Sequence, residues 1–454
     1  MMAMAVRGIE GEYEGAELGD RRLEYRLTKM AKALAEDPAK SLPKAMKTSA
    51  ELEGAYRLLR NNAVSADGIL AGHYEQTLER VAKHKLVIAI HDTTIFEFSG
   101  DEEREGLGPL RGKGQGFLGH FALLAAVETP IVPLGVLALE ALARPKKHEK
   151  AVGAEKESQR WLRGVAAVKE RLPADARVIH VMDREADNFV LMAALVEARQ
   201  GFVIRCVHDR VICPEIYLSD VLATAKTVVE RTVVLSKRKK KTALSAKQPA
   251  REGRVAHLAL SAVSTTIPRP STADKSLPAF LQVNVVHVRE VGAPPDCEPV
   301  DWRLVTTEPV TKRSDLERIV DCYRARWLIE EYFKAIKSGC EYESRQMESL
   351  QTLLNTLALI VPIAWRLLLM RTLSRQAPDV PAKKALTKAQ LAILARRRYG
   401  LLPKGASVRE AMLAVARMGG HIKSNGEPGW STLGYGFQRL LALEEGWLAA
   451  KADM

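Results

Sequence analysis

The chain has 454 residues, which is too long for a single compact core and suggests about two to four folding units. Hydrophobic residues make up 47% of the sequence and charged residues 27%, a globular composition that excludes a disordered or fibrous protein. The formal net charge of +13 at pH 7 favours a polyanionic partner such as nucleic acid, with a merely basic surface as the alternative.

Neither the cysteines nor the apolar segments indicate an oxidising compartment or a membrane. The five cysteines include no CxxC pair and no histidine partner at zinc spacing, so we expect a reduced compartment and no structural zinc. The first residues lack the apolar core of a signal peptide, and the apolar stretch at residues 353–370 is interrupted by Asn355, Pro362 and Arg366. We expect this stretch to be a buried helix, and the protein to be soluble and cytoplasmic with no membrane partner.

The segment from about residue 18 to residue 60 has apolar side chains at helical spacing with cations between them. We predict a small basic helical unit that carries these cations on its outer faces. They are Arg21, Arg22, Arg26, Lys29, Lys44, Lys47, Arg57 and Arg60.

The next segment alternates short apolar runs with one helix. Strands are predicted at residues 86–90, 121–127 and 134–139, a helix at residues 155–172, and a fourth strand at residues 178–182. The order is βββαβ, in which the first and fourth strands can lie side by side and parallel. Such an order predicts an α/β fold.

Each of these two strands leads into an aspartate, Asp92 after the first and Asp183 after the fourth. A ribonuclease-H-like fold places two carboxylates together in this way, and ligands of open α/β sheets bind at such strand ends. Either aspartate alone could simply end a strand or cap a helix. The pair in one topology predicts a shared acidic site.

The residues after Asp183 alternate like β-structure at 232–235, 257–263 and 281–288, which predicts a β-rich insertion in the catalytic domain. A run of five cations at residues 237–241 is expected on an exposed loop, either solvated or in contact with phosphates.

The segment YRARWLIEEYFKAIK, residues 323–337, is predicted to be one helix. At about 100° per residue, one face contains an acid, three cations and two aromatic side chains, while Glu331 lies about 100° away from Glu330. A solvated face with ion pairs is the alternative, but Arg and Lys beside a carboxylate suit a phosphate site. Glu330 is therefore the preferred metal ligand. The face comprises Tyr323, Arg326, Trp327, Glu330, Lys334 and Lys337.

Two separated motifs resemble the IS4 family of bacterial transposases. The signature Tyr-x2-Arg-x3-Glu-x6-Lys is present as Tyr323, Arg326, Glu330 and Lys337, and residues 183–187 read Asp-Arg-Glu-Ala-Asp. The resemblance extends through LGDRR, EGAYRLLRN, HDTT, EKESQRWL, DWRLVTTEPV and PGWSTLGYGFQRL.

The resemblance implies a ribonuclease-H-like catalytic core between two helical domains. Residues 1–68 would form the N-terminal helical domain that binds transposon ends. Residues 69–370 would form the catalytic domain, with the β-rich insertion at about residues 200–312. Residues 371–454 would form a C-terminal helical dimerisation domain, with a simple helical cap as the alternative.

The implied activity is cut-and-paste transposition of DNA. Asp92, Asp183 and Glu330 would hold two divalent ions, Mg²⁺ or Mn²⁺, for phosphodiester cleavage. The resemblance also implies a DNA hairpin intermediate and transfer of the 3′-OH ends into target DNA. The partners would be double-stranded DNA, as terminal inverted repeats and target, and a second copy of the chain in a synaptic homodimer. The bacterial cytoplasm is the expected location, with nucleoid association on DNA.

Several further residues are expected to contact this DNA. By resemblance, Trp302 would stack on a flipped base and Trp327 would enter the vacated space, although Trp302 could instead belong to the core. Tyr323, Arg326 and Lys337 would hold phosphates, with Arg205 and Arg210 touching the same region, unless each serves an ordinary ion pair. Lys334 shares their helix face, and Arg21, Arg22, Arg26 and Lys44 would contact the transposon end.

Two other functions fit parts of the sequence. A stand-alone metal-dependent nuclease of the same fold would cut DNA without strand transfer, and a transposase-derived repressor would bind DNA without cutting it. The intact acidic triad argues against the repressor. The Tyr-Arg-Glu-Lys face and the C-terminal helical segment argue against the simple nuclease.

Overall fold

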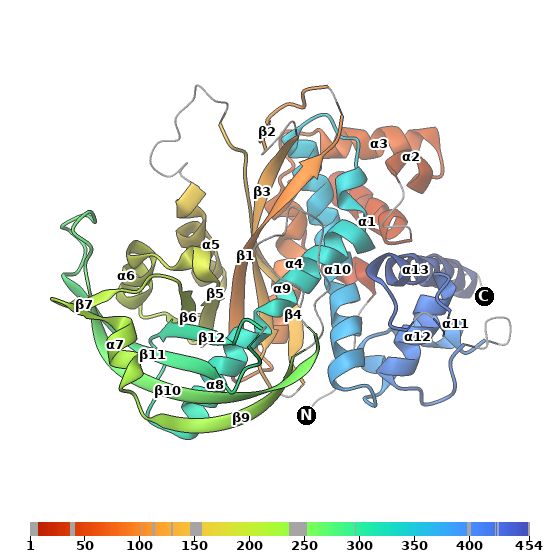
Figure 1. The fold of residues 1–454 in the computed structure, drawn as a ribbon. Coiled ribbons are helices and arrows are strands. Elements are labelled where there is room, and N and C mark those ends of the chain that lie inside the picture. Colours follow the sequence, from red (N-terminus) through yellow and green to blue (C-terminus); the bar gives the residue numbers. More distant parts are fainter. Residues whose placement is uncertain are drawn as a thin grey trace. The chain divides into compact units, whose positions relative to one another are not determined.

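The computed structural model in Figure 1 describes residues 8–36, 41–100, 102–110, 114–128, 130–145, 157–235, 252–295, 297–396, 401–422, 424 and 426–452. The chain divides into two compact units. Unit 1 consists of Met1–Ala176 with Trp327–Met454, and unit 2 consists of Arg177–Arg326.

Unit 1 begins with the 3-10 helix η1 (Ile9–Glu12) and four helices, of which the first three form the predicted basic segment. They are α1 (Arg21–Glu36), α2 (Leu42–Ala45), α3 (Ser49–Leu59) and α4 (Ala66–Val81). Thr48 and Glu51 form a capping box at the start of α3, and the Ser65 side chain accepts a hydrogen bond from the Gly68 amide at the start of α4. The predicted helical character of this region is confirmed.

An antiparallel sheet forms the centre of unit 1. Strand β3 (Gln115–Ala126) pairs with β1 (Val87–Phe98) on one side and with β4 (Val132–Leu142) on the other, and the short β2 (Gly108–Pro109) also pairs with β3. Strand β3 is buried from Gly116 to Ala126, so both of its faces are covered. The predicted strands are confirmed: residues 134–139 lie within β4, and residues 121–127 correspond to the second half of β3, which ends one residue earlier.

The prediction that the first strand ends before Asp92 is wrong, because β1 continues to Phe98. The β-branched residues Thr93, Thr94 and Ile95 favour extended backbone. The rings of Phe96 and Phe98 are fully buried beyond them. Asp92 therefore lies inside a strand, opposite Phe121 of β3.

Helices cover this sheet. Helix α5 (Arg160–Arg171), preceded by η3 (Glu157–Gln159), packs against β3 and β4, and α9 (Trp327–Lys334) packs against β1. The π-helix η6 (Ala335–Gly339) and the 3-10 helix η7 (Tyr342–Ser344) continue the chain after α9.

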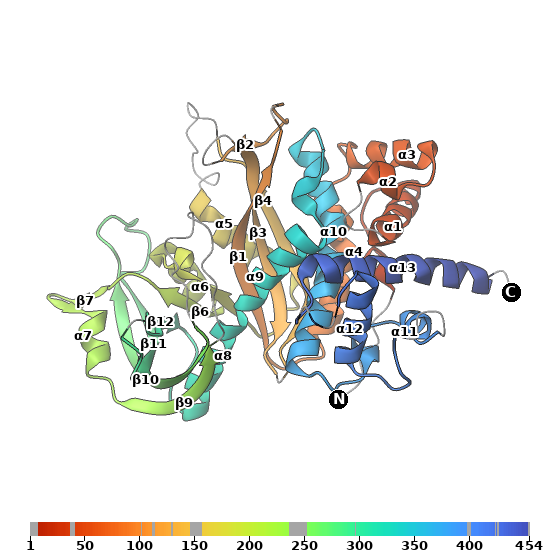
Figure 2. The same ribbon diagram turned by 45° about the vertical axis from the view of Figure 1, so that its right-hand side comes forward.

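Helix α10 (Leu350–Gln376) is the predicted buried helix. Its length and composition would suit a membrane span, but 94% of its most apolar 18-residue window is buried inside the protein. The remaining helices of unit 1 are η8 (Ala382–Lys384), α11 (Lys388–Leu394), α12 (Val408–Met418) and α13 (Trp430–Ala452), with α13 the long helix near the C-terminus in Figure 2. A Cβ atom at Gly436 would lie 1.8 Å from the Val415 carbonyl oxygen, so glycine lets α13 approach α12.

Unit 2 contains a mixed sheet in the order β5-β6-β12-β11-β10-β9. Its strands are β5 (Val178–Met182), β6 (Gly201–Cys206), β9 (Thr227–Leu235), β10 (Arg254–Pro268), β11 (Phe280–Val291) and β12 (Asp301–Thr306). Strands β5 and β6 are parallel and the others antiparallel, and Figure 2 shows β9 and β10 as long, curved strands. The predicted β-rich insertion is confirmed, whereas the basic run at residues 237–241 lies outside the described residues.

Helices and a small hairpin complete unit 2. They are η4 (Arg184–Ala186), α6 (Phe189–Glu197), α7 (Leu218–Ala223), α8 (Arg313–Ala325) and the hairpin of β7 (Val211–Cys213) with β8 (Ile216–Tyr217). Helix α8 contacts β6, β9, β10 and β11 and therefore covers one face of the sheet.

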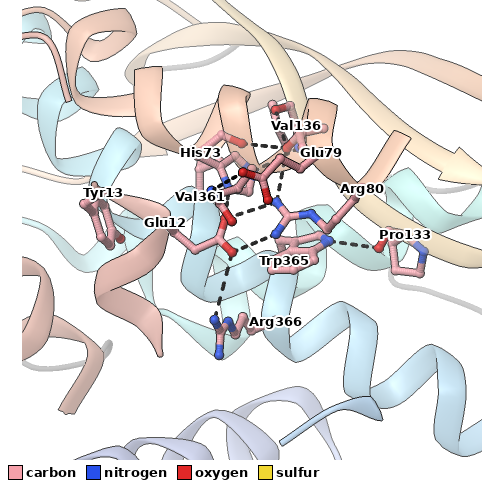
Figure 3. A network of polar contacts seen from close by, with 12 residues as sticks. Glu12, Tyr13, His73, Glu79, Arg80, Pro133, Val136, Val361, Trp365 and Arg366 are labelled. Carbon is pink, nitrogen blue, oxygen red and sulfur yellow. Dashed lines mark hydrogen bonds and ion pairs between the residues drawn. The ribbon is translucent and has the colours of Figure 1, made fainter. Parts of the chain in front are cut away.

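A buried polar network ties the N-terminal segment to the centre of unit 1 (Figure 3). The carboxylate of Glu12 accepts hydrogen bonds from Arg80 at 2.8 and 3.1 Å and contacts Nδ1 of His73 at 2.5 Å. Arg366 of α10 lies 3.9 Å from Glu12, and the Arg80 guanidinium lies 4.0 Å from the centroid of the Trp365 ring. Burial opposes ionisation of Glu12, but His73 and Arg80 outweigh it and hold the pKa of Glu12 well below its usual range.

We expect Glu12→Gln to lower the free energy of unfolding by about 3–5 kcal/mol, because Arg80 and Arg366 would remain buried without their counter-charge. Urea unfolding of the full chain at pH 7.5 measures this change. Glu14→Gln is the matched control: Glu14 is exposed, so its replacement should change stability by less than about 0.5 kcal/mol. Equal effects of the two variants would contradict a stabilising role for the network.

Candidate active site

Asp92 and helix α9, which carries Glu330, lie on the same face of the unit 1 sheet. Asp92 is directly opposite Phe121, and residues opposite each other in an antiparallel pair share a face. The Phe121 ring packs on Tyr332 and Phe333 of α9, with centroid distances of 5.9 and 5.5 Å. Glu330 is carried by the same helix, three residues before Phe333. Unit 1 therefore brings Asp92 and the helix that carries Glu330 to one face of its sheet.

Both acids are half-buried. Oδ1 of Asp92 accepts a hydrogen bond from the backbone N–H of Thr93 at 2.7 Å. This contact orients one carboxylate oxygen while the side chain keeps access to solvent.

Glu331 has a different environment from Glu330. Its carboxylate lies 2.5 Å from Nζ of Lys334, 3.6 Å from Nε of Arg371 and 3.5 Å from Arg375. Burial opposes its ionisation, but these three cations outweigh it and lower the pKa of Glu331. Three cations bind Glu331 within unit 1, which supports the prediction that Glu330 is the metal ligand of the two.

Lys334 and Lys337 are both held by neighbouring groups. Lys334 pairs with Glu331 and lies 5.7 Å from the Trp327 ring centroid. Lys337 donates to the backbone carbonyl of Ile95 on β1 and lies 3.0 Å from Glu343. Lys337 is thus placed along the strand that carries Asp92.

The prediction of one regular helix over residues 323–337 is wrong. Helix α8 ends at Ala325, where the Arg326 amide makes a tight i→i−3 bond to the Tyr323 carbonyl at 3.1 Å. After α9 the chain forms the π-helix η6, closed by a wide i→i−5 bond from the Cys340 amide to the Ala335 carbonyl at 2.9 Å. Spacing of about 100° per residue therefore does not apply along the whole signature.

In unit 2, the Asp-Arg-Glu-Ala-Asp motif directly follows β5. Asp183 is half-buried and caps η4 by accepting a hydrogen bond from the Glu185 amide at 2.9 Å. The second aspartate of the motif, Asp187, is buried and accepts from the amides of Val207 and His208 at 2.7 and 3.0 Å. The motif thus combines an accessible acid with a buried one that fixes the loop.

Arg210 is the ion-pair partner of Asp187. Burial raises the pKa of Asp187, but Arg210 and the two backbone amides outweigh this effect and the net shift is downward. Only 10% of the Arg210 side chain is exposed. The structure gives Arg210 the ion-pair role that was the alternative to DNA contact, and the DNA contact stays a prediction.

Tyr323 is the centre of a cluster in unit 2. Its ring packs edge to face on Trp302 with centroids 5.2 Å apart, and the Arg326 guanidinium lies 5.9 Å from its centroid. Burial raises the pKa of Tyr323, while Arg326 and Arg205 partly offset that rise. Trp302, Arg205 and Arg326, which are all predicted to contact DNA, thus lie around Tyr323.

The two tryptophans predicted to contact flipped DNA differ in exposure. Trp302 is half-buried on β12, and Trp327 is 53% exposed at the start of α9. Exposure of a large aromatic ring to this extent suits a contact with another molecule.

The predicted N-terminal DNA contacts lie at the surface of unit 1. Arg21, Arg22 and Lys44 are exposed and Arg26 is half-buried. Lys44 also lines a cavity of about 500 Å³, together with Tyr56 of α3 and Tyr435 of α13.

The three predicted acids suit hard divalent cations. All three are half-buried carboxylates, whose oxygens Mg²⁺ and Mn²⁺ prefer. Asp92 and Glu330 belong to unit 1 and Asp183 to unit 2. Within either unit, the described residues contain no group of three or more His, Cys, Asp or Glu side chains that could hold a metal.

Sequence reasoning did not single out Arg160 and His120, which contact Thr93 beside Asp92 at 2.8 and 3.0 Å. Thr93 and Arg160 lie in the segments HDTT and EKESQRWL and His120 in neither, and periodicity alone cannot show that these three residues meet.

Half-buried carboxylates in an α/β protein that also exposes cations suit a metal-dependent enzyme acting on nucleic acid. Residues 159–365 match the family model of the transposase DDE domain, and residues 8–64 match the model of transposase DNA-binding domains. The chain is a DDE transposase with a ribonuclease-H-like catalytic fold and an N-terminal DNA-binding domain. It is thus an enzyme that uses divalent metal ions to cleave DNA and transfer strands.

Among solved structures, the chain is similar to the piggyBac transposase in a synaptic complex with hairpin DNA. The identity is 9%, the match covers 96% of this chain and 73% of that chain, and the TM-score is 0.39. A likeness this distant adds nothing to the assignment.

Arg210→Gln and Arg205→Gln should separate structure from DNA contact. Loss of the Arg210 partner leaves Asp187 buried and unpaired, so we expect a loss of about 3–5 kcal/mol of stability. Arg205→Gln should spare stability but reduce the salt dependence of DNA binding by about one phosphate contact. Thermal unfolding and binding titrations over a salt series distinguish the two. An unchanged unfolding midpoint for Arg210→Gln would reject its structural role.

Proposed function

We propose that this chain is a cut-and-paste transposase of the IS4 family, similar to the Tn5 transposase. It binds terminal inverted repeats, cleaves both DNA strands through a hairpin intermediate and joins the freed 3′-OH ends to target DNA. The observation that carries the proposal is the DDE domain match, because Asp183 and Glu330 both lie inside the matched residues. The signature at Tyr323, Arg326, Glu330 and Lys337 supports the IS4 family specifically.

Asp92, Asp183 and Glu330 are the proposed metal ligands. Two Mg²⁺ ions held by these carboxylates would activate water or a 3′-OH as nucleophile and stabilise the charge on the leaving oxygen. The Thr93 amide keeps an oxygen of Asp92 oriented, and the Glu185 amide does the same for Asp183. The two aspartates are therefore partly preorganised by the backbone beside them.

The Tyr323 cluster is the proposed phosphate-binding site next to the cleaved bond. Arg205 and Arg326 supply its positive charge. Lys334 of α9 and Lys337 of η6 are also proposed to contact phosphates. Arg side chains bind phosphate oxygens in a bidentate manner. The ring contact between Trp302 and Tyr323 would hold the indole in place to stack on a base removed from the duplex.

The N-terminal helices are the proposed reader of the transposon end. Arg21, Arg22, Arg26 and Lys44 would contact phosphates and base edges. A second copy of the chain would bind the other end, with helices α11, α12 and α13 forming the contact between subunits.

We expect Asp92→Ala, Asp183→Ala and Glu330→Ala to abolish cleavage of cognate ends in Mg²⁺ while end binding stays near normal. Loss of a direct ligand should exceed the effect of losing an outer-shell partner, which is about 10- to 100-fold. Glu331→Ala is the matched control and should be much milder, since its carboxylate pairs with cations of unit 1. Denaturing gels and mobility shifts provide the two measurements. Efficient cleavage by any one triad variant would remove that residue from the site.

Trp302→Ala should separate the steps of the reaction. The first nick should persist, because it needs only the acids and a positioned water. Hairpin formation should slow by about 5- to 150-fold, since stacking contributes roughly 1–3 kcal/mol per base. An abasic site near the end should partly restore it by lowering the unstacking cost. A time course of nicked, hairpin and double-strand-break products tests this order, and equal slowing of both steps without rescue would place Trp302 in the core instead.

A further inference from the structure

Thr93, Arg160 and His120 form a polar network on the face of β1 opposite Asp92, and the proposed reaction does not use it. Thr93 follows Asp92 in the strand, so its side chain projects from the opposite face of the sheet, toward α5. Its hydroxyl oxygen accepts a hydrogen bond from Nε of Arg160 at 2.8 Å and lies 3.0 Å from Nδ1 of His120.

The members of the network are closely packed. Arg160 and His120 are 6% and 2% exposed, and His120 is the cross-strand neighbour of Thr93. The His120 ring packs edge to face on Trp161, with centroids 4.9 Å apart. A Cβ atom at Gly164 would lie 2.8 Å from Nε2 of His120, so only glycine lets α5 come this close.

The hydrogen-bond directions follow from the charge state of His120. Burial, with the charges of Arg160 and Arg163, lowers the pKa of His120 to about 3, so the ring is neutral. Nδ1 can then accept the proton of the Thr93 hydroxyl, whose oxygen already accepts from Arg160. Among the described residues, Nε2 has no hydrogen-bond partner. The fold thus leaves one buried polar group unpaired while it keeps the contact to Thr93.

The network reaches Asp92 through the backbone. The Thr93 backbone amide donates to Oδ1 of Asp92 at 2.7 Å and so orients this carboxylate. The hydroxyl of the same residue is held by Arg160 and His120 on the opposite face of the sheet. Without its hydroxyl contacts, Thr93 would lose the restraint that α5 and β3 place on this part of β1.

We propose that Arg160, Thr93 and His120 are positioning residues that hold the Asp92 carboxylate in the orientation needed to bind a divalent cation. The proposal rests on the proposed role of Asp92 as a metal ligand. Outer-shell groups of this kind typically change metal affinity by about 10- to 100-fold.

The test measures Mn²⁺ affinity of the full chain by electron paramagnetic resonance, beside the Mg²⁺ dependence of end cleavage and the thermal midpoint. Thr93→Val keeps the β-branched shape and removes the hydroxyl, and Arg160→Gln removes the charged donor. Each should weaken Mn²⁺ binding by about 10-fold and shift half-maximal cleavage to higher Mg²⁺. Thr93→Ser retains the hydroxyl and should stay near wild type.

The control is Thr356→Val. Thr356 is fully buried in α10 and donates to the Thr352 carbonyl at 2.7 Å, so it also loses a buried hydroxyl bond but lies in another element. It should lower the thermal midpoint without changing Mn²⁺ affinity.

Wild-type Mn²⁺ affinity in folded Thr93→Val, or equal weakening in Thr93→Ser, would overturn the proposal. If Thr93→Val does not fold, Arg160→Gln decides, and unchanged Mn²⁺ affinity in that variant overturns it as well. Failure of the wild-type chain itself to bind Mn²⁺ and cleave cognate ends would instead overturn the proposed function.

Discussion

The burial of helix α10 is the constraint on which the rest of unit 1 depends. A largely buried helix is stabilised when the polar groups that it carries are paired, because an unpaired one is costly in an apolar interior. Asn355 donates to the carbonyls of Leu59 and Val64 at 3.0 and 3.2 Å, and Trp365 donates to the carbonyl of Pro133 at 3.0 Å. These few polar side chains therefore specify where the N-terminal helices and the sheet dock on an otherwise apolar surface.

The same helix restrains α9, which carries the proposed catalytic acid Glu330. The Tyr332 hydroxyl donates to the Val361 carbonyl of α10 at 3.0 Å, and Arg371 and Arg375 of α10 hold Glu331. With Tyr332 and Glu331 engaged by α10, the helix cannot rotate without breaking buried contacts. These contacts, made 29 to 44 residues later in the chain, distinguish the environment of Glu331 from that of its neighbour Glu330.

Local patterns in the sequence predicted secondary structure well where the burial of apolar side chains determines it. The run of residues 178–182, apolar except for His180, predicted β5 with its observed bounds, and the alternating runs predicted parts of β9, β10 and β11. The continuation of β1 past Asp92 was missed because an acid next to two threonines looks like a strand end, whereas burial of Phe96 and Phe98 extends the strand. The π-helix was missed because its wide turn leaves no mark on apolar spacing. Of the site, the acids could be found from motifs. The partners of Asp187 and Thr93 could not, since they arrive from other strands and helices.

Part of the positive charge that suggested a nucleic-acid partner is buried and therefore cannot contact DNA. Arg80, Arg160 and Arg366 are each less than 9% exposed, and Arg80 and Arg366 share the carboxylate of Glu12. Such arginines stabilise the fold, and neighbouring carboxylates offset much of their charge. The charge available to a DNA backbone is that of the exposed cations, among them Arg21 and Arg22 at the start of α1. Because screening confines each exposed charge to about 8–10 Å, these surface positions, more than the net charge of the chain, determine where a phosphate backbone can bind.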